Sequence, residues 1–279
     1  MKKYLAGILG FAMCIGFTIS CSSVMTKTLI DTVFSKRPID KLLADIDSTQ
    51  ALFNSVDKSI GAARNYLFDF AANQERKSQL QASEKELAEA AGDVERITIE
   101  LKQVEAKEAK KGDAKNSTAA DSIAAKQTKL AQRIEKANLL RADVIQRKDE
   151  AIYFSKTNGD LEKVRLSEKQ FKQISNLLWN LKLASLQSQY LVENSGSMIV
   201  NATEVVTNAK PTDLHYLKVP KLKAALEKDL PEIKKRSEYN FATVKAFTEA
   251  TNTIRKTNPI PDPGNPTKND KFRPVDEVF

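Results

Sequence analysis

The sequence predicts an all-α protein, a bundle of about three long helices with a projecting antiparallel coiled-coil hairpin. Residues 39 to 210 contain no proline, a residue that helices accept only in their first turn. This stretch is rich in Ala, Glu, Lys, Leu and Gln, which favour helices. No part of the chain sustains the alternation of apolar and polar residues that marks a strand.

Residues 1–20 have the three parts of a secretory signal peptide. Lys2 and Lys3 precede an apolar run from Tyr4 to about Ile19, and small residues follow. The run has roughly 16 residues, whereas a membrane-spanning helix needs about 20. We therefore expect cleavage, with an uncleaved N-terminal anchor as the alternative.

The chain has two cysteines, Cys14 inside the apolar run and Cys21 directly after it. The residues Thr18, Ile19, Ser20 and Cys21 resemble the lipobox of bacterial lipoproteins, in which the cysteine is lipidated and becomes the first mature residue. Thr18 departs from the usual leucine, so ordinary secretory cleavage is a further alternative. The resemblance implies lipidation at Cys21 and a lipid-anchored protein of the bacterial cell envelope. Ser22, in place of a retention aspartate, implies the outer membrane.

Residues 21–37 are expected to form a lipidated linker that contains a short amphipathic helix from Val24 to Phe34, lying either on the bundle or on the bilayer. The helical body is expected to cover residues 38–257. After Pro38, heptad spacing predicts one very long helix with two seams, rows of apolar residues that meet a neighbouring helix. The first seam is Ile39, Leu42, Ile46, Thr49, Phe53, Val56, Ile60, Ala63, Leu67 and Phe70. The second, one position out of phase after Gln74 and Lys77, is Leu80, Ser83, Leu87, Ala90, Val94, Ile97, Leu101 and Val104.

A polar turn at 110–118 predicts that the chain folds back about Asp113, so that residues 77–154 form the hairpin. Thr118 and Asp121 have the spacing of a capping box, and the following helix should run to about Phe154. Its seam is thinner, and it consists of Ile123, Leu130, Ile134, Ala137, Leu140, Val144 and Ala151. A narrow, charge-rich seam needs only one partner, which favours a coiled coil that projects from the bundle.

The break at Thr157–Asp160 precedes a central helix predicted from Leu161 to Val206. Its apolar residues lie on three sides, so at least two helices must cover it. The third side is Trp179, Leu183, Leu186 and Tyr190, and the seam also holds Ser167, Ser185, Ser188 and Ser195. The helix could lie beside the hairpin or beside the first half of the long helix, and the length of the first seam favours the second arrangement.

The segment Asn208–Val219 reads as a loop that contains Pro211 and the only histidine, His215. A last helix then runs to Lys256, with a kink or restart at Pro231. Its inward face is Leu222, Leu226, Leu230, Ile233, Phe241, Val244, Phe247 and Ile254. Residues 258–279 are rich in proline and are expected to be extended or disordered.

The sequence contains no convergent set of catalytic, cofactor-binding or metal-binding residues, and we assign none. His215 alone supplies neither a metal cluster nor a catalytic triad. The net charge is +8, with ten Lys or Arg against five Asp or Glu between Lys218 and Lys256. This basic last helix could meet anionic lipid or an acidic partner. We expect no nucleic acid partner.

These features favour a membrane-tethered, non-enzymatic interaction or scaffold lipoprotein, in which the hairpin contacts a protein partner. One alternative is a periplasmic holdase, similar in style to the small basic chaperones that grip unfolded outer-membrane proteins between helical arms. A membrane-acting helical toxin is a further alternative. It would need an apolar hairpin of about 18 residues or more, and the best segment, Leu177–Val192, contains Lys182.

Overall fold

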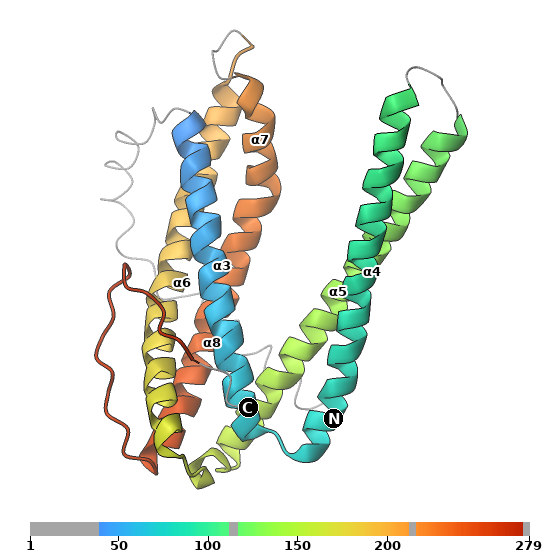
Figure 1. The fold of residues 1–279 in the computed structure, drawn as a ribbon. Helices are drawn as coiled ribbons and strands as arrows, with labels where there is room; N and C mark the ends of the chain where they lie inside the picture. The colour runs from blue at the N-terminus through green and yellow to red at the C-terminus, as the bar shows by residue number, and fades with distance from the viewer. Residues whose placement is uncertain (1–38, 112–116, 212–215, 276–279) are drawn as a thin grey trace, which may run out of the picture. The chain divides into compact units, whose positions relative to one another are not determined.

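The computed structural model describes residues 39–111, 117–211 and 216–275 (Figure 1). Every regular element in these ranges is helical, which confirms the all-α class. The long helices are α3 (Ile39–Ala71), α4 (Gln74–Lys111), α5 (Ser117–Thr157), α6 (Glu168–Asn208) and α8 (Leu230–Lys256). The short ones are the 3-10 turns η1 (Leu161–Lys163) and η2 (Tyr216–Lys218), α7 (Val219–Ala224) and the π turn η3 (Ala225–Asp229). These five long helices differ from the expected three.

The prediction of one very long helix after Pro38 is wrong, because α3 ends at Ala71 and a separate helix, α4, begins at Gln74. The side-chain oxygen of Asn73 accepts a hydrogen bond from the backbone N–H of Arg76 at 2.9 Å. This is an N-cap, which satisfies one of the free N–H groups at the start of a helix. The shift in phase near Gln74 therefore marks the end of one helix and the start of another.

The predicted break at Thr157–Asp160 is confirmed, because α5 ends at Thr157. Gly159 terminates the helix. Gly159 has a φ of +71°, a conformation that favours glycine. The N–H of Asp160 donates to the carbonyl of Ser155 at 2.9 Å, and that of Gly159 donates to the carbonyl of Lys156 at 3.3 Å. These two bonds are the Schellman pattern that closes a helix.

The central helix starts later than expected, at Glu168 and not at Leu161. The side-chain oxygen of Gln170 accepts a hydrogen bond from the backbone N–H of Ser167 at 2.7 Å. The Ser167 hydroxyl donates to the same oxygen at 2.9 Å, so Gln170 closes the start of the helix as in one half of a capping box. Ser167 therefore lies at the start of α6, and its predicted place in the seam is wrong.

The described residues divide into two compact units, one made of residues 39–54 with 189–211 and 216–238, the other of residues 55–111 and 117–188 with 239–275. The first unit has an apolar core built from α3, α6, α7, η3 and α8. Its buried members are Ile39, Leu42, Leu43, Ile46, Met198, Ala202, Leu222, Ala225 and Leu230. The discontinuity expected at Pro231 is the π turn η3, which directly precedes α8. Because proline has no N–H and its ring crowds the carbonyl four residues earlier, a widened turn is a suitable place for it.

In the second unit α6 lies beside α3, the arrangement that the seam length favours. The hydroxyl of Tyr66 on α3 donates to the side-chain oxygen of Gln173 on α6 at 3.2 Å. The first seam is buried in this unit at Val56, Ile60, Ala63 and Leu67. On α6, Leu177 and Ala184 share one side, Leu183 lies about 100° around the helix from Ala184, and all three are fully buried, which agrees with a helix that has several neighbours.

Helices α4 and α5 lie against each other in the second unit (Figure 1). Ion pairs between described residues connect them, among them Glu84–Lys148 at 2.6 Å, Glu86–Lys136 at 3.1 Å, Asp93–Arg133 at 3.6 Å and Glu100–Lys126 at 2.8 Å. The partner's number falls in α5 as the residue number rises in α4, so the two helices are antiparallel. Leu80, Ala90 and Ile97 of the second seam are buried.

Four residues that were expected to face inward are exposed, and those assignments are wrong: Ile134, Leu186, Tyr190 and Phe241. On α8 the buried row passes through Ser237, Asn240, Val244 and Phe247, which leaves Phe241 one step outside it. Apolar spacing alone missed this row because two of its members are small or polar.

Candidate functional site

The predicted lipidation site Cys21 and the loop histidine His215 lie outside the described residues. The richest polar cluster that the structure describes lies where the C-terminal tail (residues 258–279, described to 275) runs beside α6 (Figure 1). Its described residues, 258–275, form no helix or strand, and side chains of α6 and α8 hold them by their backbone.

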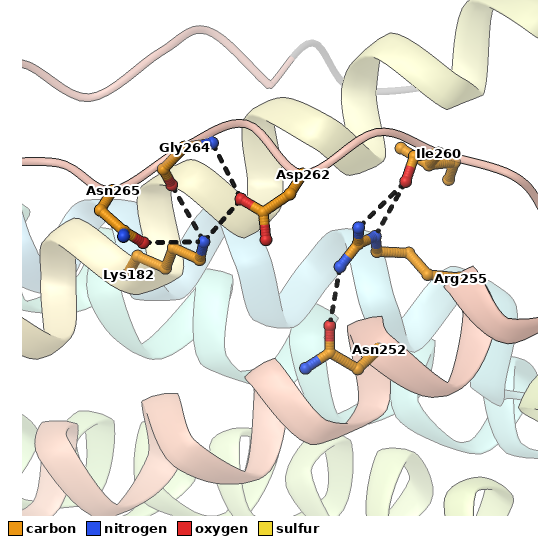
Figure 2. Close-up of polar contacts among 7 residues, drawn as sticks. All are labelled: Lys182, Asn252, Arg255, Ile260, Asp262, Gly264 and Asn265. Atoms are coloured by element: carbon orange, nitrogen blue, oxygen red, sulfur yellow. Dashed lines mark hydrogen bonds and ion pairs between the residues drawn. The ribbon is translucent and has the colours of Figure 1, made fainter.

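Asn258 and Arg255 fix the start of the tail. Asn258 is buried, and its side-chain nitrogen donates to the carbonyls of Val164 at 3.0 Å and Ile254 at 2.8 Å. Its side-chain oxygen accepts from the N–H of Leu166 at 3.2 Å. The Arg255 guanidinium donates to the carbonyl of Ile260 at 3.0 Å, as Figure 2 shows. The end of α8 and the first tail residues are therefore tied together.

Lys182 of α6 is the centre of the next group of contacts (Figure 2). Its ammonium donates to Asp262 Oδ1 at 2.7 Å, to the carbonyl of Gly264 at 2.9 Å and to Asn265 Oδ1 at 3.2 Å. The N–H of Gly264, whose φ is +88°, donates to the same oxygen of Asp262 at 2.8 Å. The Lys182 hydrogen bond, followed by that of Gly264, lowers the pKa of the Asp262 carboxyl below its ordinary value.

The tail then turns back along α6. Thr267 N–H donates to Asp270 Oδ2 at 2.7 Å, and Asp270 N–H donates to the Thr267 carbonyl at 3.1 Å. Four α6 side chains donate to carbonyls around and after this turn: Gln187 to Lys268 at 3.0 Å, Trp179 to Lys271 at 3.2 Å, Asn180 to Arg273 at 2.7 Å and Asn176 to Pro274 at 3.0 Å. This surface of α6 therefore recognises an extended backbone.

Trp179 was expected to face the core with the third side of α6. It is instead half-buried and covered by the tail, with the Arg273 guanidinium 3.7 Å from the centre of its ring. A cation over an indole face is an attractive contact. The polar residues Asn176, Asn180 and Gln187 share one side of α6 and could have indicated a polar partner there. The prediction considered only the spacing of apolar residues and therefore missed them.

A second polar cluster joins α3, α5 and α8 in the same unit. Arg64 is buried, and its Nε lies 2.7 Å from Asp149 Oδ1. The hydroxyl of Tyr239 donates to the other Asp149 oxygen at 2.8 Å. Burial, followed by the negative charge of Asp149, raises the pKa of Tyr239. This cluster connects the three helices.

Apolar side chains are exposed on α4 and α5. Ile99, Leu139, Tyr153 and Phe154 have exposed fractions of 49%, 67%, 61% and 47%. Phe154 lies at a crevice of about 290 Å³, where the Arg76 guanidinium is 4.3 Å from the centre of its ring. Aromatic and arginine side chains beside a crevice are typical of protein-binding surfaces.

The lysines of α7 and its neighbours lie on the surface of the first unit. Several pair with carboxylates: Lys218 with Asp40, Lys221 with Asp47 at 3.8 Å and Lys223 with Glu227 at 3.8 Å. These pairs neutralise part of the basic excess that the sequence shows in this region.

Ser188 and Ser195 on α6 are completely buried, as their seam positions predict, and Ser185 is half-buried. Small side chains at such positions let helices approach closely. Among the described residues no cluster of His, Cys, Asp or Glu could hold a metal ion. No helix within the described ranges has the length and apolar character needed to span a membrane.

Comparison of the chain with protein-family models, with curated proteins and with solved structures finds no match. Inference about function therefore depends on the residues and contacts described above.

Proposed function

We propose that this chain is a membrane-tethered, non-enzymatic interaction or scaffold lipoprotein of the bacterial cell envelope. A lipid on Cys21 would hold it at a membrane, with the outer membrane favoured by Ser22. The α4–α5 pair would project as a coiled-coil hairpin and contact a protein partner. The basic residues between Lys218 and Lys256 would face anionic lipid or an acidic partner.

The exposed apolar side chains of α4 and α5 carry this proposal. Both helices are otherwise covered by charged residues, and ion pairs such as Glu86–Lys136 already satisfy the charges between them. Leu139 and Tyr153 nevertheless expose 67% and 61% of their surface. A paired helix surface with aromatic and aliphatic side chains in water is suited to burying them against another protein.

Site-specific photo-crosslinking in the native bacterium tests the hairpin contact. A photoreactive residue at position 139 or 153 is expected to give one discrete crosslinked product. Val200, an equally apolar residue that is 63% exposed on α6, is the matched control and is expected to give none. The same product from all three positions, or from none, would refute a partner site on α4–α5.

The tether has its own test. Mass spectrometry of the mature N-terminus is expected to find an acylated Cys21, and Cys21→Ser should release the chain from the membrane fraction. An unmodified mature N-terminus would show ordinary secretion. In that case the interaction proposal would stand without the lipid.

The exposed apolar residues also favour the alternative of a periplasmic holdase, because such chaperones cover unfolded chains with apolar arms. The purified chain would then suppress aggregation of an unfolded outer-membrane protein at a stoichiometric ratio. Leu139→Glu would weaken this effect, whereas Val200→Glu would not. A discrete crosslinked partner without suppression of aggregation would instead support the scaffold.

A further inference from the structure

Gln187 carries an acceptor oxygen that the C-terminal tail leaves unpaired. The residue is 4% exposed, and its side-chain nitrogen donates to the carbonyl of Lys268 at 3.0 Å. Its side-chain oxygen is buried and meets no donor among the described residues. Buried polar atoms are nearly always paired, so this oxygen points to a missing hydrogen-bond donor.

Asn180, on the same side of α6, shows what the missing contact should be. Its side-chain nitrogen donates to the Arg273 carbonyl at 2.7 Å, and its oxygen accepts from the Arg273 N–H at 2.7 Å. One amide side chain thus pairs with both backbone groups of one residue. Gln187 has the same amide donor and acceptor, but only its nitrogen has a hydrogen-bond partner.

The turn of the tail leaves few backbone N–H groups available on either side of Lys268. Near Gln187 the tail has Pro266, which lacks an N–H. The N–H groups of Thr267 and Asp270 are used inside the turn that reverses the tail. The segment can therefore offer a carbonyl to Gln187, while these three residues have no N–H to give.

The spacing of the two amides fits a straight peptide better than it fits the tail. Asn180 and Gln187 are seven residues apart on α6, which is about 10 Å along a helix. A peptide in the polyproline II conformation has three residues per turn and rises about 3.1 Å per residue, so residues three apart face the same side about 9 Å from each other. In the tail, the residues that contact Gln187 and Asn180 are Lys268 and Arg273, which are five positions apart because the tail turns between them.

We propose that the surface of α6 from Asn176 to Gln187 is a binding site for a peptide segment of another protein in the extended polyproline II conformation, and that the tail occupies it in the free chain. The segment would offer both backbone groups to Asn180 and, three residues earlier, to Gln187. A basic side chain beside Asn180 would cover Trp179, as Arg273 does. Recognition through the backbone leaves the other side chains of the segment unrestricted.

This site is separate from the α4–α5 surface, and it requires no lipid on Cys21. A peptide must compete with the tail. The tail is held in part by the hydrogen bond from Lys182 Nζ to Asp262 Oδ1, which is 2.7 Å long. Loosening the tail should therefore increase the affinity for a peptide, because less of the site is occupied.

The test uses the purified full chain and two synthetic proline-rich peptides that carry one arginine and have alanine three positions before it, because proline favours the polyproline II conformation. The peptides are identical, except that one has an N-methyl group on the residue three positions before the arginine, which removes the N–H meant for Gln187. Calorimetry is expected to show weaker binding of the methylated peptide by about threefold to tenfold, the effect of one hydrogen bond. Asp262→Asn should tighten the binding of both peptides.

Gln187→Met is the matched variant, because it keeps the length of the side chain and removes its amide. It should bind both peptides equally, and circular dichroism would verify its fold. Equal affinities of the two peptides for the unmodified chain, or no binding to the Asp262→Asn chain, would overturn the proposal. Because α4–α5 crosslinks should be unchanged in Asp262→Asn, failure here is distinguishable from failure of the proposed function.

Discussion

Arg64 on α3 and Asp149 on α5 form a largely buried ion pair, with 9% and 23% of their side-chain surfaces exposed. Their closest atoms are 2.7 Å apart, and Tyr239 on α8 donates to the same carboxylate. The Asp149 carboxylate of α5 therefore connects α3 and α8 of the second unit. A carboxylate with two donors in a buried setting is costly to leave without them.

We expect Asp149→Asn to reduce the free energy of unfolding by about 2–3 kcal/mol, because it leaves the Arg64 charge buried without a counter-charge. Tyr239→Phe should cost about 1 kcal/mol, the value of one hydrogen bond. Urea unfolding of each variant measures both losses. Asp143→Asn, on the exposed side of α5 beside Arg147, is the control and should change little. An Asp149→Asn loss no larger than that of the control would contradict this account.

Two glycines with open space around them should respond to alanine in opposite directions. Gly159→Ala is expected to destabilise the chain by about 1 kcal/mol, because the φ of +71° strains any residue with a Cβ. Gly61→Ala, inside α3, should stabilise it by about 0.5–1 kcal/mol through its greater helix propensity. Thermal unfolding followed by circular dichroism compares the two. A shift of the same sign for both would show that the Gly159 turn is not as described.

The start of α4 depends on the side chain of Asn73. Asn73→Ala should cost about 1 kcal/mol by removing the cap, whereas Asn73→Asp keeps an acceptor and should be close to neutral. Hydrogen exchange of the first turn of α4 locates the effect, which should be confined there. Equal exchange rates in the alanine variant and the parent would mean that the cap contributes nothing.

Acid should release the C-terminal tail from α6. The pKa of Asp262 is lowered by Lys182 and Gly264, so its contribution is complete above the ordinary aspartate pKa of about 3.9. It is lost as the pH falls through that value and then through the lowered pKa of the folded chain. Trp179, the only tryptophan, contacts the tail and reports this loss as a red shift of its emission.

The Asp262→Asn variant separates this event from general acid unfolding. It should show the red-shifted emission already at neutral pH and should lack the corresponding step on titration. Circular dichroism at each pH verifies that the helices persist. A variant whose emission matches the parent at neutral pH would exclude Asp262 as a contributor to holding the tail.

The sequence by itself determined the helical class and most of the buried rows. Periodicity every three and four residues is a local property, and it placed Leu42, Val56 and Leu67 in the core of α3 and Leu80 and Ile97 in that of α4. The leader and Cys21 were likewise read from local residues, and that site stays a prediction because it lies outside the described ranges.

Tertiary structure alone decided where polar residues find their partners. Trp179 and Asn180 contact residues more than 90 positions away, and nothing in local spacing indicates that a proline-rich tail returns to them. Local spacing also failed to predict the position of Phe241. This residue is exposed, because the buried side of α8 contains Ser237 and Asn240 instead. An apolar period reports burial on one helix, whereas a hydrogen bond between distant segments depends on how the whole unit closes.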